Sequence, residues 1–346
     1  MAHFVGLDVS VKSTSICIVE NSGAVVARGE VSTVPDQIAG FIYRYAPDAE
    51  RVIHESGILA IWLTRELDKL GLPIVCIDAR LAHKALSGRV NKSDRGDAEG
   101  LAQLARTGWY TQVHIRSGDS ARVRALIGAR ERLIRMRKDL EAHVRGTLKV
   151  FGICLAPITR GKKRQRFRDQ LTQAGRADPM LNMMAETFNP THEVLCTAAE
   201  AIDAELRQIA RGSDLAGRLM TVPGVGPIVA LAFIATLDDA SRFRKSKDVG
   251  AFLGLTPRRH QSGDMDWSGR ISKCGDQDMR RLLYSAATTL MTQVRKPSHL
   301  HAWAMRLKER KGFKKAAVAT SRKIAVIMHC IWRDESIFEP KMGGIA

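Results

Sequence analysis

The sequence predicts an α/β domain at the N-terminus, a long helical arm, and a mainly helical domain at the C-terminus. Residues 3–33 contain three short runs of alternating apolar and polar side chains with a turn at 21–23, which is the pattern of a β-meander. Farther along, Leu126, Leu133 and Leu140 recur every seven residues, which is typical of a long helix. We therefore expect three domains, at 1–114, 115–213 and 214–346.

The order of the N-terminal elements narrows the choice of fold class. After the three strands, helices and strands alternate, and they are expected at 34–45, 51–54, 58–70, 73–77 and 94–106. Three antiparallel strands followed by alternating strands and helices describe a ribonuclease-H-like layer. Asp8 then lies on the first strand, and Glu55 ends the fourth.

Four acids are framed by these elements: Asp8, Glu55, Asp94 and Asp97. Asp94 and Asp97 are three residues apart on one predicted helix, so both can face the same side. Carboxylates at strand ends are costly to desolvate unless a cation or a proton neutralises them, and Mg²⁺ prefers oxygen ligands. The acids therefore predict a divalent-metal site, with turn-capping or helix-capping roles as the alternative.

The helix from 117 to about 151 is expected to pack in an arm with a second helix at about 182–211. Val123 and Val144 lie on the same seam as the three leucines, but Arg130 and Arg137 also fall on it. A short coiled coil is therefore a hypothesis, and a packed pair of helices is the firmer expectation.

A strong excess of positive charge indicates nucleic acid as the partner. The chain has 54 Lys and Arg against 36 Asp and Glu, a formal net charge of +18, and a pI near 10.0. The excess is dense from 116 to 169, and a basic loop is expected at 157–176. Lys162, Lys163 and Arg164 are its candidate phosphate contacts, with a solvated helix face as the alternative. A ribosome-associated or membrane-surface protein would share this excess.

Composition argues against several other classes. Hydrophobic residues make up 45% of the chain, yet no run approaches the roughly 18 to 20 apolar residues of a membrane span, and no leader precedes the first strand. A cytosolic protein without a membrane partner is expected. The six cysteines are far apart and form no Cys-x-x-Cys pair, so neither a zinc site nor a disulfide framework is predicted.

Glycine-rich and basic motifs occupy the C-terminal domain. Pro-Gly-Val-Gly at 223–226 lies between two predicted helices, where glycines let backbone amides approach a phosphate, as in helix-hairpin-helix turns, or simply join the helices. Basic clusters follow it. Their candidate nucleic-acid contacts are Arg258, Arg259, Arg270, Lys273, Arg280 and Arg281.

These motifs occur in an order that resembles one known family over nearly the whole chain. The order is Asp8, Glu55, Asp94, Asp97, then Pro-Gly-Val-Gly, Gly-Leu-Thr-Pro-Arg, Ser-Gly, Ser-Lys-x-Gly and Arg-Arg-x-Leu-Tyr. It resembles the DEDD transposases of bacterial insertion sequences, the Piv-invertase-like enzymes described as bridge-RNA-guided recombinases.

The resemblance implies more than composition does. It implies a RuvC-like domain whose four acids hold Mg²⁺, a coiled-coil arm, and a transposase domain whose serine, Ser262 here, attacks the DNA phosphodiester and becomes covalently attached. It also implies dimers that assemble into tetramers, and a noncoding guide RNA that pairs with donor and target DNA. The expected location is the bacterial cytoplasm, at the nucleoid.

Alternatives remain open at the site and for the function. Ser272 is a rival nucleophile, and Asp264 and Asp266 follow Ser262 without an assigned role. A metal-dependent nuclease or Holliday-junction resolvase would use the acids without a covalent intermediate, and a basic binding protein would use none of them. The Ser262 motif favours strand exchange, because a phosphoserine keeps the energy of the cut strand for rejoining.

Overall fold

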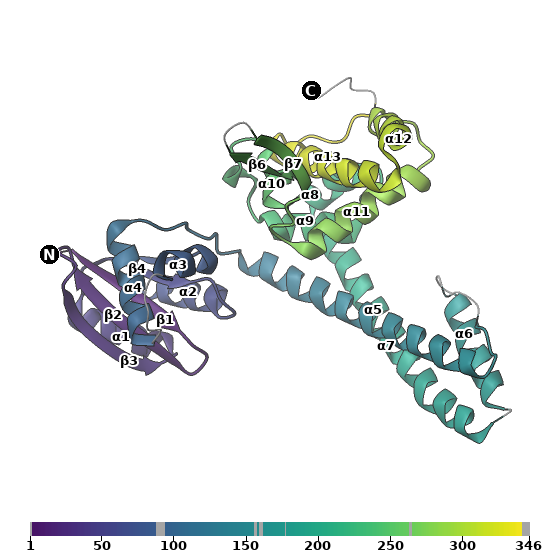
Figure 1. Cartoon of the computed structure of the whole chain (residues 1–346), viewed down its shortest axis with the longest axis horizontal. Helices are drawn as coiled ribbons and strands as arrows, with labels where there is room; N and C mark the ends of the chain where they lie inside the picture. Colours follow the sequence, from purple (N-terminus) through teal and green to yellow (C-terminus); the bar gives the residue numbers. More distant parts are fainter. Residues whose placement is uncertain are drawn as a thin grey trace. The chain divides into compact units, whose positions relative to one another are not determined.

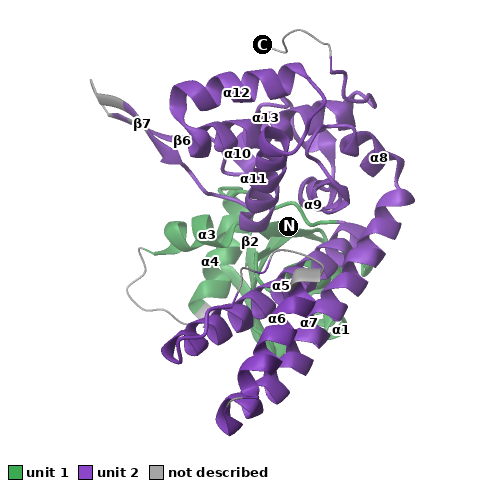
Figure 2. Cartoon of the chain, turned by 90° about the vertical axis from the view of Figure 1, so that its right-hand side faces the viewer, with its two compact units in different colours: residues 1–116 green, residues 117–346 purple. Residues whose placement is uncertain are grey.

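A computed structural model describes residues 2–87, 94–155, 158, 162–176, 178–262 and 265–340. At 94, 95, 162, 163, 260, 262, 265, 266 and 268 it describes the backbone alone. The chain forms two compact units, Met1–Arg116 and Ser117–Ala346, which are coloured separately in Figure 2. In the part of the chain so described, no helix is both long enough and apolar enough to cross a membrane.

Unit 1 is built on a five-stranded mixed sheet in the order β3-β2-β1-β4-β5. The strands are β1 (His3–Val9), β2 (Ser13–Glu20), β3 (Val25–Ser32), β4 (Ala49–Glu55) and β5 (Ile74–Ile77). The first three pair antiparallel, whereas β4 runs parallel to β1 and β5 runs parallel to β4. The predicted meander and the two strands after it are confirmed, and the unit has the mixed α/β sheet expected of a ribonuclease-H-like domain.

Helices cover both faces of this sheet. Because side chains alternate along a strand, Leu7 of β1 packs with α1 (Pro35–Tyr45) and α2 (Ala60–Lys69), whereas Phe4 packs on the opposite face. That opposite face carries α3 (Ala79–Leu86) and α4 (Asp94–Thr107). The eight-residue helix α3 was not predicted, although Asp78 caps it by accepting hydrogen bonds from two backbone amides.

Unit 2 begins with a helical arm. Figure 1 shows α5 (Gly118–Val150) and α7 (Pro179–Arg211) lying along one another, with α6 (Lys162–Gly175) against α7. The two long helices confirm the predicted helical stretches. The basic loop expected at 157–176 is wrong over most of its length, because residues 162–175 are helical. Phe167 and Leu171 bury one face of α6 and hold it against the arm.

The buried face of α5 matches the predicted seam only in part, because Arg137 and Val144 are buried on that seam. The three heptad leucines are only half-buried. The buried positions of α5 instead include apolar and charged residues: Ile127, Glu131, Arg137, Glu141, Val144 and Leu148. Arg137 forms an ion pair with Glu141 one turn along α5. Glu131 and Glu141 also contact Arg281 and His192 on other helices, and sequence periodicity does not reveal such partners.

The remainder of unit 2 is mainly helical and surrounds α9 (Pro227–Leu237). This helix is apolar on every side, so it requires cover all round. It packs in one core with residues of α8 (Asp214–Met220), α11 (Gln277–Thr292) and α13 (Phe313–Arg333). The other elements are α10 (Asp248–Phe252), β6 (Pro257–Ser262), β7 (Met265–Ile271) and α12 (His299–Lys311).

The glycine-rich turn at 223–226 joins α8 to α9, as predicted. Gly224 has a φ of 90°, and a Cβ placed there would lie 2.4 Å from the carbonyl oxygen of Ala286 on α11. Close packing against α11 therefore requires glycine at this position. Gly226 has no neighbouring atom within 4 Å of such a Cβ position, so its surroundings are open.

Candidate active site

Two of the predicted acids lie on neighbouring strands. In the parallel register of β1 and β4, Leu7 pairs with His54. The next residues along the two strands are Asp8 and Glu55, so the two acids end adjacent strands on the same face of the sheet. Both side chains are half-buried.

The direction of α4 decides where the other two acids lie. A Cβ on Gly6 of β1 would fall 2.2 Å from the carbonyl oxygen of Ala98, near the start of α4. Toward the other end of the helix, the carbonyl oxygen of Ala105 accepts a hydrogen bond of 2.7 Å from Nη1 of Arg51, a residue near the start of β4. Helix α4 therefore runs antiparallel to β1 and β4, and its first turn lies at their C-terminal ends.

Asp97 thus comes to the same end of the same face as Asp8 and Glu55. Asp94 begins α4, but its side chain lies outside the described residues. Among the side chains that the structure does describe, no three from His, Cys, Asp and Glu stand close enough together to hold a metal ion. The donors gathered at this end are carboxylates, which are the hard oxygen ligands that suit a divalent cation.

His54 supports the strand end from the opposite face of the sheet. Its Nδ1 hydrogen-bonds the carbonyl oxygen of Glu55 at 3.0 Å, and its Nε2 lies 2.7 Å from Oγ1 of Thr64. Burial lowers the pKa of His54 to about 4, so the imidazole is neutral near pH 7. A neutral ring must donate through Nδ1 to the carbonyl, and Nε2 then accepts from the threonine hydroxyl. Sequence reasoning did not select His54, because one histidine in an apolar strand carries no signal of its own.

Ser262 lies at the far end of a two-stranded hairpin. Strands β6 and β7 pair antiparallel, and Ser262 is opposite Met265 at the last pair before the turn. The Ser262 side chain lies outside the described residues, as do Asp264 and the side chain of Asp266. The rival Ser272 lies at the base of the same hairpin, where its Oγ accepts a hydrogen bond of 3.4 Å from the amide of Cys274.

The predicted nucleic-acid contacts on the hairpin are exposed. Arg258 and Arg259 lie on β6, Arg270 lies on β7, and Lys273 follows β7. Arg258 also donates from Nη2 to the carbonyl oxygen of Ser272, at 3.2 Å. The fold therefore gathers these four cations on one element with Ser262.

The other residues predicted to contact nucleic acid either have partners within the protein or have side chains outside the described residues. Arg280 donates hydrogen bonds to backbone carbonyls, and Arg281 pairs with Glu131 on α5 at 2.5 Å. Arg164 on α6 pairs at 2.6 Å with Glu200, whereas the side chains of Lys162 and Lys163 are outside the described residues. Charge alone did not reveal these internal partners.

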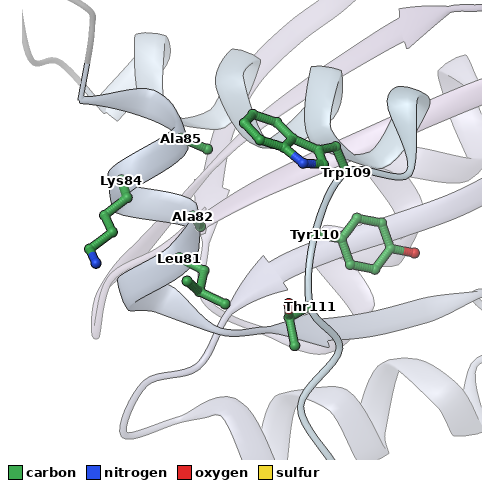
Figure 3. Close-up of a pocket in the computed structure, with 7 residues that line it drawn as sticks. All are labelled: Leu81, Ala82, Lys84, Ala85, Trp109, Tyr110 and Thr111. Atoms are coloured by element: carbon green, nitrogen blue, oxygen red, sulfur yellow. The ribbon is translucent and has the colours of Figure 1, made fainter. Parts of the chain in front are cut away.

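A cavity of about 290 Å³ opens elsewhere on unit 1. Figure 3 shows its lining, in which Leu81, Ala82 and Ala85 of α3 face the segment of Trp109 and Tyr110. Trp109 follows the C-terminal end of α4 and is 73% exposed. Asp97 and the strand ends that carry Asp8 and Glu55 lie at the N-terminal end of that helix, so the cavity is separate from these acids.

Comparison with known proteins gives two matching families. Residues 5–153 match the DEDD domain family of IS110-type elements, described as "Transposase", and residues 216–303 match the "Transposase IS116/IS110/IS902 family". The two matches cover most of unit 1, part of the arm, and the segment from α8 into α12.

Two transposases match over most of their length, and a third relative matches over a shorter segment. The chain is 30% identical over 333 residues to the transposase for insertion sequence element IS1111A of Coxiella burnetii, covering 93% of this chain and 87% of that protein. It is 29% identical over 340 residues to a probable family 20 transposase of Pseudomonas aeruginosa, covering 97% and 98%. The pilin gene-inverting protein of Moraxella lacunata matches at 26% over 129 residues, covering 37% and 39%.

Proposed function

The chain belongs to the IS110/IS116/IS902 family of insertion-sequence transposases with an N-terminal DEDD domain, and we propose that it cuts and rejoins DNA through a covalent phosphoserine intermediate. The nucleophile in this proposal is Ser262. Its support is the position of Ser262 at the free end of a hairpin that also carries Arg258, Arg259 and Arg270. Ser272, at the hairpin base with a hydrogen-bonded Oγ, is the weaker candidate.

The acids of unit 1 are proposed to hold the metal. The DEDD family implies a divalent cation, and we infer Mg²⁺ held by Asp8, Glu55, Asp94 and Asp97. The antiparallel course of α4 supports this set, because it brings Asp97 to the strand ends that carry Asp8 and Glu55. A bound Mg²⁺ would stabilise negative charge on the reacting phosphate and favour the serine alkoxide.

The residues of the hairpin suit the attack on a DNA phosphodiester that is proposed for it. Oγ of Ser262 forms a bond to phosphorus while one P–O bond of the DNA backbone breaks, so the serine loses a proton and the departing DNA oxygen gains one. Negative charge builds on the phosphate oxygens during this step. The exposed guanidinium groups of Arg258 and Arg259 are suited to neutralise it. Rejoining is the reverse step with a different DNA hydroxyl, and it needs no external energy source.

Several finer features of the proposal are supported by motif order and family membership. We infer a RuvC-like domain at 1–114, a coiled-coil arm at 115–213 and a transposase domain at 214–346 with a helix-hairpin-helix-like turn at 223–226. We also infer a noncoding guide RNA, and dimers that assemble to tetramers in which acids and serine come from different protomers. DNA binding places the protein at the bacterial nucleoid in the cytoplasm.

The test is a search for the covalent intermediate. The protein is incubated with Mg²⁺, its native flanking RNA and labelled DNA containing both element ends, and denaturing gels are examined for a protein–DNA adduct. The proposal expects an adduct with wild type and with Ser272→Ala, and none with Ser262→Ala. Cleavage without an adduct, unchanged in Ser262→Ala, would instead establish a hydrolytic nuclease or junction resolvase. An adduct lost only in Ser272→Ala would move the nucleophile to the hairpin base.

A further inference from the structure

The hairpin that carries Ser262 has little support of its own. Strands β6 and β7 form a separate two-stranded sheet, and in the described chain neither strand pairs with a third. Figure 2 shows the hairpin projecting from the helices of unit 2. Two strands alone are marginally stable in water. The direction in which the hairpin projects must therefore be set where it joins the helices.

That junction is a close crossing of two chain segments. A Cβ on Gly254 would lie 2.0 Å from the carbonyl oxygen of Cys274, and a Cβ on Gly275 would lie 2.2 Å from that of Phe252. Both glycines have positive φ, 67° and 94°. Lys273 also has a positive φ of 56°, and its amide donates to the carbonyl oxygen of Gly254 at 3.1 Å. The crossing admits no side chain at either glycine and contains an uncommon conformation for lysine.

One side chain bridges both segments of this crossing. Nη1 of Arg280 lies within hydrogen-bond distance of three carbonyl oxygens, those of Gly275 at 2.9 Å, Leu253 at 3.2 Å and Cys274 at 3.4 Å. Leu253 precedes β6, whereas Cys274 and Gly275 follow β7. The guanidinium therefore ties the entry and the exit of the hairpin to each other and to α11.

Helix α11 is itself held firmly. Asp276 caps its N-terminus by accepting a 2.7 Å hydrogen bond from the amide of Met279, and it forms an ion pair with Arg124 of α5. One turn farther, Arg281 pairs with Glu131 of α5. The bridge made by Arg280 thus starts from a helix that is fixed to the arm at two points.

We propose that Arg280 is a positioning residue that aims the β6–β7 hairpin, and with it Ser262, toward the DNA phosphodiester. This inference rests on the proposed role of Ser262. It differs from the expectation for Arg280 as a phosphate contact, because the Nη1 donors are directed to backbone carbonyls. Loss of the bridge lets the hairpin swing about its base, and small misplacements of a nucleophile are costly to rate.

The experiment separates positioning from phosphate binding. Arg280→Ala and Arg280→Lys are compared with wild type and with Arg207→Ala, which removes an exposed charge on α7. At saturating DNA we expect the rate of adduct formation to fall about 10- to 100-fold in both Arg280 variants. DNA affinity and its salt dependence should stay unchanged. Lysine keeps the charge, but its side chain is shorter than that of arginine and does not reach the position of Nη1, so it should not rescue the rate.

Amide hydrogen exchange gives a readout that does not depend on activity. Exchange in residues 257–271 should accelerate in both Arg280 variants, while α5 and α7 keep wild-type protection and so report an intact fold. Unchanged hairpin exchange, with weaker DNA binding and a salt slope lower by about one, would overturn the proposal and make Arg280 a phosphate contact. If wild type forms no Ser262 adduct, the proposed function fails, whereas the exchange data still test the positioning role.

Discussion

Arg124 and Asp276 form an ion pair although 152 residues separate them in the chain. Arg124 also donates to Oγ1 of Thr236 on α9 at 2.9 Å, so one guanidinium joins α5, α9 and the start of α11. Its side chain is 29% exposed and that of Asp276 is 12% exposed. The pair is shielded enough that removing one partner leaves the other poorly solvated.

Arg124→Met is therefore expected to lower the free energy of unfolding by about 1 to 3 kcal/mol, because Asp276 loses its partner. Urea denaturation of the full chain measures this change. The matched control is Arg122→Met, two residues away, whose ion pair with Asp119 is largely exposed. Surface pairs contribute little, so the control should change stability by less than about 1 kcal/mol. Equal effects of the two substitutions would contradict the structural role of the Arg124–Asp276 pair.

Asp97→Asn is expected to abolish Mg²⁺-dependent DNA cleavage, because it removes a proposed metal ligand at the first turn of α4. DNA binding measured without Mg²⁺ should persist. Asp36→Asn is the control, since Asp36 is an exposed acid in the first turn of α1, on the opposite face of the sheet. Undiminished cleavage by the Asp97 variant would remove this residue from the metal site.

Gly6→Ala is expected to destabilise unit 1 by about 2 kcal/mol or more, because the added methyl group would collide with the backbone of α4. To relieve this collision α4 would have to move, which would displace Asp97 from the strand ends and reduce cleavage. Gly40→Ala on α1 is the control, since no atom lies within 4 Å of its Cβ position. Alanine favours helix at such a site, so stability should rise by up to about 1 kcal/mol. A neutral result for Gly6→Ala, by thermal denaturation, would show that α4 does not pack as described.

The buried imidazole of His54 should make the stability of the fold depend on pH. Burial lowers its folded-state pKa to about 4, whereas a histidine in the unfolded chain has a pKa of about 6.5. Between these values the unfolded chain binds more protons at this position than the folded chain binds. The free energy of unfolding should therefore be complete above about pH 6.5 and fall by roughly 3 kcal/mol as the pH drops to about 4.

Substitution of His54 tests whether this histidine causes the pH dependence of stability. His54→Gln should flatten the dependence between pH 6.5 and 4 in urea denaturation of the full chain, although it lowers stability at pH 7 by disturbing two hydrogen bonds. His299→Gln, at an exposed position at the start of α12, should keep the wild-type slope. The same slope in wild type and His54→Gln would assign the acid sensitivity to other groups.

The cysteines predict a pattern of thiol labelling. Burial raises the pKa of Cys76 to about 11, so its reactive thiolate is scarce at pH 8. Cys17 and Cys196 are also buried, whereas Cys154 and Cys274 are exposed. Iodoacetamide with peptide mass spectrometry should modify the exposed pair first and Cys76 only after unfolding. Early labelling of Cys76 in the native chain would contradict its place in the sheet.

The sequence predicted the parts of the fold that depend on local periodicity. Alternation identified β1 to β3, and spacing of three placed Asp94 and Asp97 on one helix. Both signals lie within a few residues, so they can be read without knowing the partner elements. The prediction of a basic loop at 157–176 was wrong because the charge of this segment hid Phe167 and Leu171, two apolar residues that anchor α6 as a helix.

Long-range pairing explains what the sequence could not supply. Glu131 is buried on α5, and its partner Arg281 lies 150 positions later in the chain. Arg280 was predicted to be a phosphate contact, because nothing in the sequence shows that the chain brings the carbonyl group of Leu253, 27 residues earlier, to its guanidinium. The sequence shows how many charged side chains a protein has, but not which of them already have partners within the fold.

The polar pairs inside the arm also select one alignment of its helices. Between seams of identical leucines, a shift of seven residues would cost little, because each heptad resembles the next. Here such a shift would separate Arg130 from Asp203, and it would break the 3.0 Å hydrogen-bond contact between Nε2 of His192 and Oε1 of Glu141, so polar groups of the arm would lose their partners. The two long helices are consequently held in one register, so the length of the arm is fixed. Helix α5 spans about 50 Å at the helical rise per residue.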